Sequence, residues 1–176
     1  MSTRAPPLRG PGRRSQARGH LHVLQLNMRR STTGADLLRQ FLTTQSVDVL
    51  LIQDPPLALR HGESFPGYDL FLPHQQLGTS PSQFEEPLTT ILLRTTLSAR
   101  SIDFAHPRVC GVVVSTQRGP LALFSAYFQP TSGAGLMELS SILTRVRQQF
   151  PLILLGADCN GHSPWWGPPD TASSPL

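Results

Sequence analysis

The sequence contains no lysine, so each of its 15 basic residues is an arginine. It has only two cysteines, Cys110 and Cys159, which is too few for a disulfide framework. No apolar run is long enough to span a bilayer, and the basic amino terminus lacks the apolar stretch of a secretion signal. These absences argue against a secreted disulfide scaffold and against a helical membrane protein. We expect a reduced, intracellular protein with no membrane partner.

The sequence also lacks the G-x-S-x-G, P-loop and G-x-G-x-x-G motifs. It therefore offers no nucleophile elbow and no dinucleotide fingerprint, and we expect no small-molecule organic cofactor. A zinc site built from Cys159, His162 and the pair His20 and His22 is conceivable, but these ligands lack a recognised spacing. With 176 residues and no internal repeat, the chain suits one domain, which we expect to be a monomer.

Positive charge is concentrated at the amino terminus. Residues 1–30 contain seven of the 15 arginines and no acidic residue, whereas the rest of the chain has eight arginines and all 11 acidic residues. Residues 1–19 are rich in Arg, Pro and Gly, so we expect a disordered arm. The arm could contact nucleic acid phosphates or serve as an address, or it could be a solvated leader. The Pro- and Ser-rich residues 168–176 predict a disordered tail, which leaves 20–167 as the domain.

Hydrophobic periodicity predicts two helices and a series of strands. The first helix begins near Ser31, where Thr33 and Asp36 resemble a capping box, and the second covers 136–146. The predicted strands cover 20–27, 47–53, 68–72, 88–94, 108–115, 121–127 and 151–156. The middle strands have no helices between them, which disfavours a doubly wound parallel sheet. This order predicts a layered α/β sandwich with strands inside and helices on the outer faces.

Polar side chains follow four of the predicted strands, at the point where each strand ends. They are Asn27, Asp54, Tyr127 with Gln129, and the pair Asp158 and Asn160. Loops at strand ends are where functional sites gather on such sandwiches. Carboxylate and amide oxygens suit a hard divalent cation such as Mg²⁺ (or Mn²⁺). Such a site commonly serves phosphodiester chemistry, in which the metal polarises the phosphate and a carboxylate orients or deprotonates water.

Each of these residues also has an ordinary structural interpretation. Asn27 and Asp54 could be turn residues, because Asn and Asp are frequent in loops. Tyr127 could pack its ring at the end of a strand. His162 could bind a phosphate or only anchor its loop. The two indoles that follow it could cap the core or stack on a base.

Taken together, the polar strand ends resemble a known set of motifs. The segments are, in order, Q-L-N-M-R-R-S, V-D-V-L-L-I-Q-D-P-P, F-S-A-Y-F-Q-P and L-I-L-L-G-A-D-C-N-G-H-S-P-W-W-G. They are similar to those of the endonuclease/exonuclease/phosphatase superfamily, and more narrowly to the apurinic-like endonuclease domain of non-LTR (LINE-type) retrotransposons. The resemblance covers roughly residues 21–167. It implies a four-layer sandwich with two mixed β-sheets flanked by helices, and magnesium-dependent nicking of DNA in the nucleus.

The resemblance also implies a role for each position. Asn27 and Asp54 correspond to metal-binding residues, and Tyr127 corresponds to a tyrosine that contacts the phosphate. Asp158 corresponds to the aspartate that positions the attacking water, with Asn160 beside it. Alternate residues can point to one side of a loop, so we expect Asp158 and Asn160 to face the same phosphate. The further positions expected to contact substrate are Arg29, Gln129 and His162.

The sequence departs from the family motifs at two points, and these departures favour alternatives to an active DNA endonuclease. Asp54 stands where the family has Glu, and its carboxylate is shorter by about 1.5 Å. A metal ligand needs placement within about 0.5 Å, so we expect weaker metal binding. The resemblance also implies a later S-D-H segment that these residues lack, so we expect C-terminal truncation and an open sheet edge. The alternatives are a catalytically impaired remnant that binds nucleic acid weakly, and a phosphodiesterase of the same superfamily acting on a phosphoinositide, a sphingolipid or an RNA tail.

Overall fold

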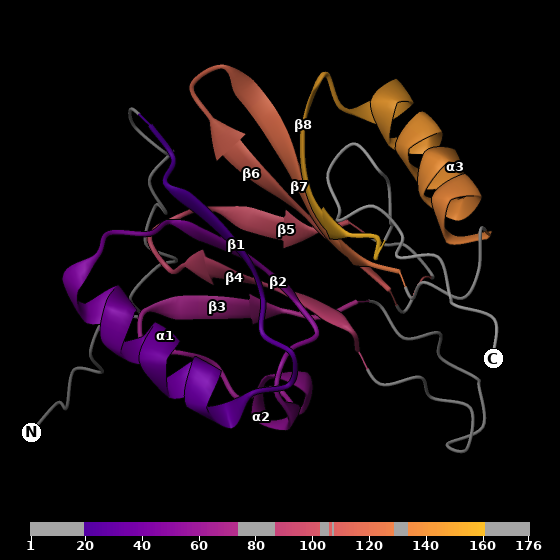
Figure 1. Ribbon diagram of the computed structural model, residues 1–176. Coiled ribbons are helices and arrows are strands. Elements are labelled where there is room, and N and C mark those ends of the chain that lie inside the picture. The colour runs from indigo at the N-terminus through magenta and orange to yellow at the C-terminus, as the bar shows by residue number, and fades with distance from the viewer. Residues whose placement is uncertain (1–19, 74–86, 103–105, 107, 129–133, 161–176) are drawn as a thin grey trace, which may run out of the picture.

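The computed structural model describes residues 20–73, 87–102, 106, 108–128 and 134–160. These residues form an α/β fold of four layers, in which two stacked sheets lie between α1 on one outer face and α3 on the other (Figure 1). The predicted fold class is confirmed. The predicted arm and tail lie outside the described residues, as do Gln129 and His162.

The first sheet contains four strands in the order β1-β2-β4-β3. Their bounds are Val23–Asn27 for β1, Val49–Gln53 for β2, Thr89–Arg94 for β4 and Tyr68–Phe71 for β3. β1 and β2 are parallel, because helix α1 (Thr32–Thr44) returns the chain between them, and the other two pairs are antiparallel. Every residue of β2 is buried, since both faces of this central strand are covered.

The second sheet contains four strands in the order β5-β6-β7-β8. Their bounds are Ala99–Ser101 for β5, Val109–Thr116 for β6, Gly119–Tyr127 for β7 and Leu152–Asp158 for β8. β6 and β7 form an antiparallel hairpin, and Gly119 at its turn has a φ of 108°. Helix α3 (Ala134–Gln149) connects β7 to β8, which are therefore parallel.

Three apolar layers hold the four structural layers together. The first lies between α1 and the first sheet and includes Leu38, Leu50 and Leu92. The second lies between the two sheets and includes Leu51 and Leu123. The third lies between the second sheet and α3. Residues of one strand alternate between adjacent layers, which is why the strands are rich in branched apolar side chains.

The structure corrects the sequence prediction at three places. Helix α1 is capped by Ser31, whose Oγ accepts a hydrogen bond from the N–H of Gly34 at 2.9 Å, so Thr33 is not the cap. A four-residue helix, α2 (Leu57–Arg60), follows Asp54 where the sequence analysis predicts no element. The short strand β5 was not predicted, because three residues are too few to show a period.

β1 is at one edge of the first sheet and β8 is at one edge of the second, and these two edges lie on the same side of the sandwich (Figure 1). The Nε2 of Gln25 in β1 donates to the carbonyl of Ala157 in β8 at 3.1 Å. This hydrogen bond joins β1 of the first sheet to β8 of the second. Among the helices that the structure describes, none has both the length and the apolar composition needed to cross a membrane.

Candidate active site

The two sheets bring their carboxyl-terminal strand ends to one place. In the first sheet, Asn27 at the end of β1 pairs with Gln53 at the end of β2, directly before Asp54. In the second sheet, Tyr127 at the end of β7 pairs with Asp158 at the end of β8. Because both pairs are parallel, each sheet presents two adjacent strand ends at the same edge.

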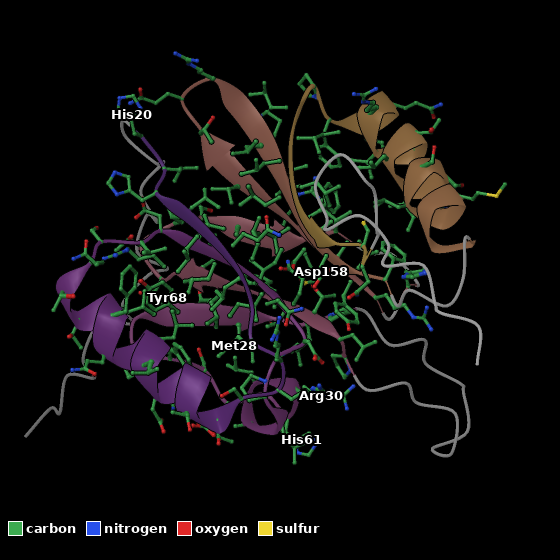
Figure 2. The ribbon with its side chains drawn as sticks, viewed as in Figure 1. His20, Met28, Arg30, His61, Tyr68 and Asp158 are labelled. Carbon is green, nitrogen blue, oxygen red and sulfur yellow. The ribbon has the colours of Figure 1, made fainter. Side chains whose placement is uncertain are left out.

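Asn27 and Asp158 join the two sheets directly. The Nδ2 of Asn27 donates to Oδ2 of Asp158 at 2.5 Å, across 131 positions of sequence. The Oδ1 of Asn27 accepts the backbone N–H of Arg29 at 2.8 Å, which fixes the orientation of the amide. The structure therefore brings together two of the predicted site residues, one from each sheet. In Figure 2, Asp158 lies at the end of β8 beside the loop that follows β1.

The loop after β8 is held by Asp158 and Asn160. The Oδ1 of Asp158 accepts the backbone N–H of Asn160 at 3.0 Å, so both oxygens of this carboxylate have a protein donor. The Nδ2 of Asn160 donates to the carbonyl of Phe128 at 2.9 Å, and the N–H of Phe128 donates to the carbonyl of Asp158 at 2.9 Å. The nitrogen of the Asn160 side chain thus secures the loop next to the half-buried Tyr127.

Asp54 is engaged by two arginines that the sequence did not identify. Its Oδ1 accepts from Nε of Arg30 at 2.9 Å and from Nη2 of Arg60 at 3.1 Å. The side chain of Arg60 is only 2% exposed, and its Nε also donates to the carbonyl of Pro55 at 2.7 Å. The backbone N–H of Arg30 donates to the carbonyl of Asp54 at 2.8 Å. We refer to Arg30, Asp54 and Arg60 as the arginine clasp.

Backbone conformation also singles out these loops. Within the part of the chain that the structure describes, four non-glycine residues have a left-handed φ, at angles between 45° and 57°. They are Arg29, Arg30, Asp54 and Asn160. Each lies in one of the loops that follow β1, β2 and β8. Such conformations cost free energy for a side chain with a Cβ, and they cluster at functional sites.

The zinc alternative gains no support from the described residues. His20 and His22 precede β1, whereas Asn27 contacts Asp158 at its other end, about 16 Å further along at roughly 3.3 Å per residue. Figure 2 shows His20 and Asp158 well separated. Burial, and next the neighbouring charge of Asp158, raise the pKa of the Cys159 thiol.

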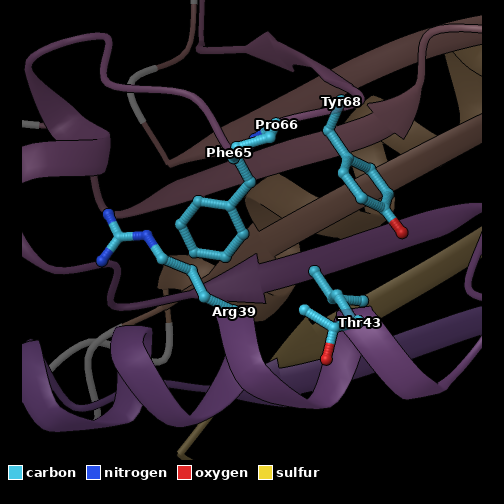
Figure 3. Close-up of a pocket in the computed structure, with 6 residues that line it drawn as sticks. Arg39, Thr43, Phe65, Pro66 and Tyr68 are labelled. Atoms are coloured by element: carbon cyan, nitrogen blue, oxygen red, sulfur yellow. The ribbon is translucent and has the colours of Figure 1, made fainter.

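A separate hollow of about 190 Å³ lies between α1 and the segment before β3 (Figure 3). It is lined mainly by apolar atoms of Leu42, Phe65 and Tyr68. The guanidinium of Arg39 lies 4.8 Å from the Phe65 ring centroid and is paired with Asp36 and Glu63. None of the predicted site residues lines this hollow, so it does not belong to the candidate active site.

Comparison with known proteins identifies the class of fold. No protein-family model matches the chain. An endonuclease/exonuclease/phosphatase family protein from Bacteroides thetaiotaomicron has a TM-score of 0.53 and 13% identity, over 80% of this chain and 62% of that chain. The four layers and the two mixed sheets therefore match the fold of that protein.

Within this class, the chain resembles retrotransposon proteins. The endonuclease domain of TRAS1, a telomere-specific non-LTR retrotransposon, has a TM-score of 0.64 and 23% identity, over 84% of this chain and 63% of that chain. The RNA-directed DNA polymerase from mobile element jockey of Drosophila melanogaster is 24% identical over 143 residues, which are 81% of this chain and 15% of that protein. The resemblance predicted from the four motifs is confirmed. The chain spans 15% of the jockey polymerase and 63% of the TRAS1 domain.

Proposed function

We propose that this chain is part of a magnesium-dependent DNA endonuclease of the retrotransposon type, which nicks a phosphodiester bond. The observation that carries the proposal is the contact between Asn27 and Asp158, which joins the strand ends of both sheets into one polar site. The left-handed residues in the surrounding loops and the similarity to the TRAS1 endonuclease domain support it.

In this proposal, Asp158 orients the attacking water and accepts its proton. The hydrogen bonds from Asn27 and from the backbone of Asn160 hold the carboxylate in one orientation, which favours a positioned base. The hydroxyl of Tyr127 and the amide of Asn160 stabilise the charge that develops on the phosphate. Arg29, Gln129 and His162 contact the DNA backbone in the same proposal.

The donor set fits Mg²⁺ in its chemistry, because Asn27 and Asp54 offer hard oxygen ligands. No group of three His, Cys, Asp or Glu suited to a metal ion occurs among the described residues. Mg²⁺ is commonly held by only one or two carboxylates, with water and substrate phosphate completing its shell. When bound, the ion would polarise the phosphate and neutralise part of its charge.

A second candidate is a catalytically impaired domain that binds nucleic acid weakly. The arginine clasp favours it, because two guanidiniums already occupy Oδ1 of Asp54. A cation would have to compete with both of them for this carboxylate. The shorter reach of Asp relative to Glu adds to the difficulty. We therefore propose that Mg²⁺ binding by this chain is weaker than that of a Glu-containing relative.

Nicking of supercoiled plasmid by the 176-residue chain tests both candidates. We expect nicking that requires MgCl₂, stops with EDTA and falls by about 10²–10⁴-fold in Asp158→Asn. Asp54→Glu should lower the MgCl₂ concentration that gives half-maximal nicking. Asp36→Asn is the matched control, because this carboxylate is 73% exposed on α1, outside the site.

The outcomes separate the candidates. If only Asp54→Glu nicks, the chain is impaired and the endonuclease ancestry stands. Nicking that persists in EDTA or in Asp158→Asn would contradict the assignment of the site. If neither the natural sequence nor Asp54→Glu nicks the plasmid, the endonuclease proposal is contradicted.

We also propose where the protein acts and in what form. Because its proposed substrate is DNA, we propose that it acts in the nucleus, and that it does so as a monomer.

A further inference from the structure

A buried glutamine connects the strands that carry the candidate active site. Gln53, the last residue of β2, is 0% exposed. Its Nε2 donates to Oγ of Ser125 in β7 at 2.9 Å and to the carbonyl of Gly156 in β8 at 3.2 Å. Its Oε1 accepts a longer bond of 3.4 Å from Nε2 of Gln25 in β1. One side chain therefore contacts three other strands, two of them in the opposite sheet.

The partners of Gln53 share one relation to the site. Gln25 lies two residues before Asn27, Ser125 two before Tyr127, and Gly156 two before Asp158. These residues and their successors are in the strands β1, β7 and β8, where positions two apart lie on the same face. The residues that Gln53 contacts therefore lie two positions before the predicted site residues in each strand, on the face directed toward the opposite sheet.

The network around Gln53 is complete. The hydroxyl of Ser125 donates to the carbonyl of Ile52 at 2.9 Å and accepts from Gln53 and from Oγ1 of Thr89, the latter at 2.6 Å. A hydroxyl has one donor and two acceptor sites, so Ser125 has no capacity left. Among the described residues, no buried side-chain nitrogen or oxygen lacks a partner. A fully satisfied buried network specifies one arrangement of the strands around it.

We infer that Gln53 is a positioning residue that sets the distance between the strand ends bearing Asn27 and Asp158. The inference rests on the proposed function, because it assigns Gln53 a role in keeping that site assembled. Gln53 does not reach substrate or metal. It acts by holding β2, β7 and β8 in one relative position while Asp54, the next residue, turns into the loop.

Gln53→Met in the full chain tests this role, since Met keeps the length of the side chain and removes its polar atoms. The control is Thr90→Val. Thr90 is equally buried, but its Oγ1 donates to the carbonyl of Phe71 at 2.7 Å, so it joins β4 to β3 within the first sheet and does not contact β1 or the second sheet through this bond. The first readout is the side-chain amide resonance of Asn27 in isotope-labelled protein, which reports its bond to Asp158. The second is kcat and the MgCl₂ dependence of plasmid nicking, compared at equal folded fraction.

We expect Gln53→Met to shift the Asn27 amide resonance and to lower kcat or Mg²⁺ affinity by about 10–100-fold, as loss of a supporting hydrogen bond does at metal sites. Thr90→Val should leave both readouts unchanged. If Gln53→Met does not fold, Ser125→Ala removes one of the two bonds donated by Gln53 to the second sheet, and it should produce a smaller shift in the same resonance.

The positioning role is overturned if the Asn27 amide resonance of Gln53→Met is the same as that of the natural sequence. If Gln53→Met does not fold, the same comparison is made with Ser125→Ala. The Asn27 resonance tests the positioning role of Gln53 whether or not the protein cleaves DNA. Absence of nicking by the natural sequence and by Asp54→Glu bears on the proposed function alone.

Discussion

Gly156→Ala should force apart the two sheets next to the candidate site. A Cβ at position 156 would lie 2.8 Å from Cδ1 of Leu51, 3.1 Å from Cβ of Leu51 and 3.2 Å from Cδ of Gln25. Ordinary carbon contacts are about 3.5–4.0 Å. Leu51 is only 1% exposed, so its side chain has little room to move, and its Cβ is fixed to the backbone of β2. Overpacking of this kind costs about 1–3 kcal/mol.

The loss is measurable by thermal and urea unfolding. In a domain of this size, about 1 kcal/mol corresponds to roughly 2–4 °C in Tm, so Gly156→Ala should lower Tm by about 2–12 °C. Leu51→Val is the partner variant, since it removes the Cδ1 atom involved in the 2.8 Å contact. The double variant should be more stable than the sum of the single losses predicts, with a coupling of about 0.5–3 kcal/mol. Unchanged stability in Gly156→Ala, or additive losses, would refute the packing argument.

Two further predictions concern buried groups. Arg60→Met should lower the free energy of unfolding in urea by about 1.5–3 kcal/mol, because a buried, charged hydrogen-bond donor to Asp54 is lost. Arg39→Met, whose side chain is 35% exposed, should cost less than about 1 kcal/mol, and equal losses would contradict the buried clasp. Burial raises the pKa of Cys110 to about 12 from an ordinary value of 9.0. The folded state then keeps a proton that the unfolded state releases, so stability should fall as pH rises from about 9 to 12. Lysine side chains would titrate in the same pH range, but the chain has none. Cys110→Ala should therefore visibly flatten the fall of unfolding free energy with pH. An unchanged slope would refute the raised pKa of Cys110.

Much of the fold was predictable from the sequence because the signals are local. The alternation in β1, the branched apolar run of β2 and the helical spacing of α3 each involve neighbouring residues. Short elements such as α2 and β5 escaped prediction because they contain less than two periods of any pattern. The Ser31 cap escaped because Ser and Thr occur together there, and only the backbone conformation decides between them.

The sequence also indicated which strand ends carry polar groups, but not how these groups contact one another. Asn27 was expected to bind metal, and the structure adds that its amide donates to Asp158. The signal that could have identified Gln53 is a polar residue at the end of a wholly apolar strand. No local pattern could have revealed that it contacts Ser125 and Gly156, which lie 72 and 103 positions away.

The sequence by itself determined the longer elements, their order, the layered α/β class and the set of polar strand ends. The tertiary structure decided how the two sheets lie on each other, and so which of those ends meet. Hydrophobic periodicity fixes the face that a strand buries, but it does not fix how far one sheet slides over the other. That offset depends on side-chain packing between the sheets, such as that of Gly156 on Leu51, and on hydrogen bonds between residues far apart in the chain.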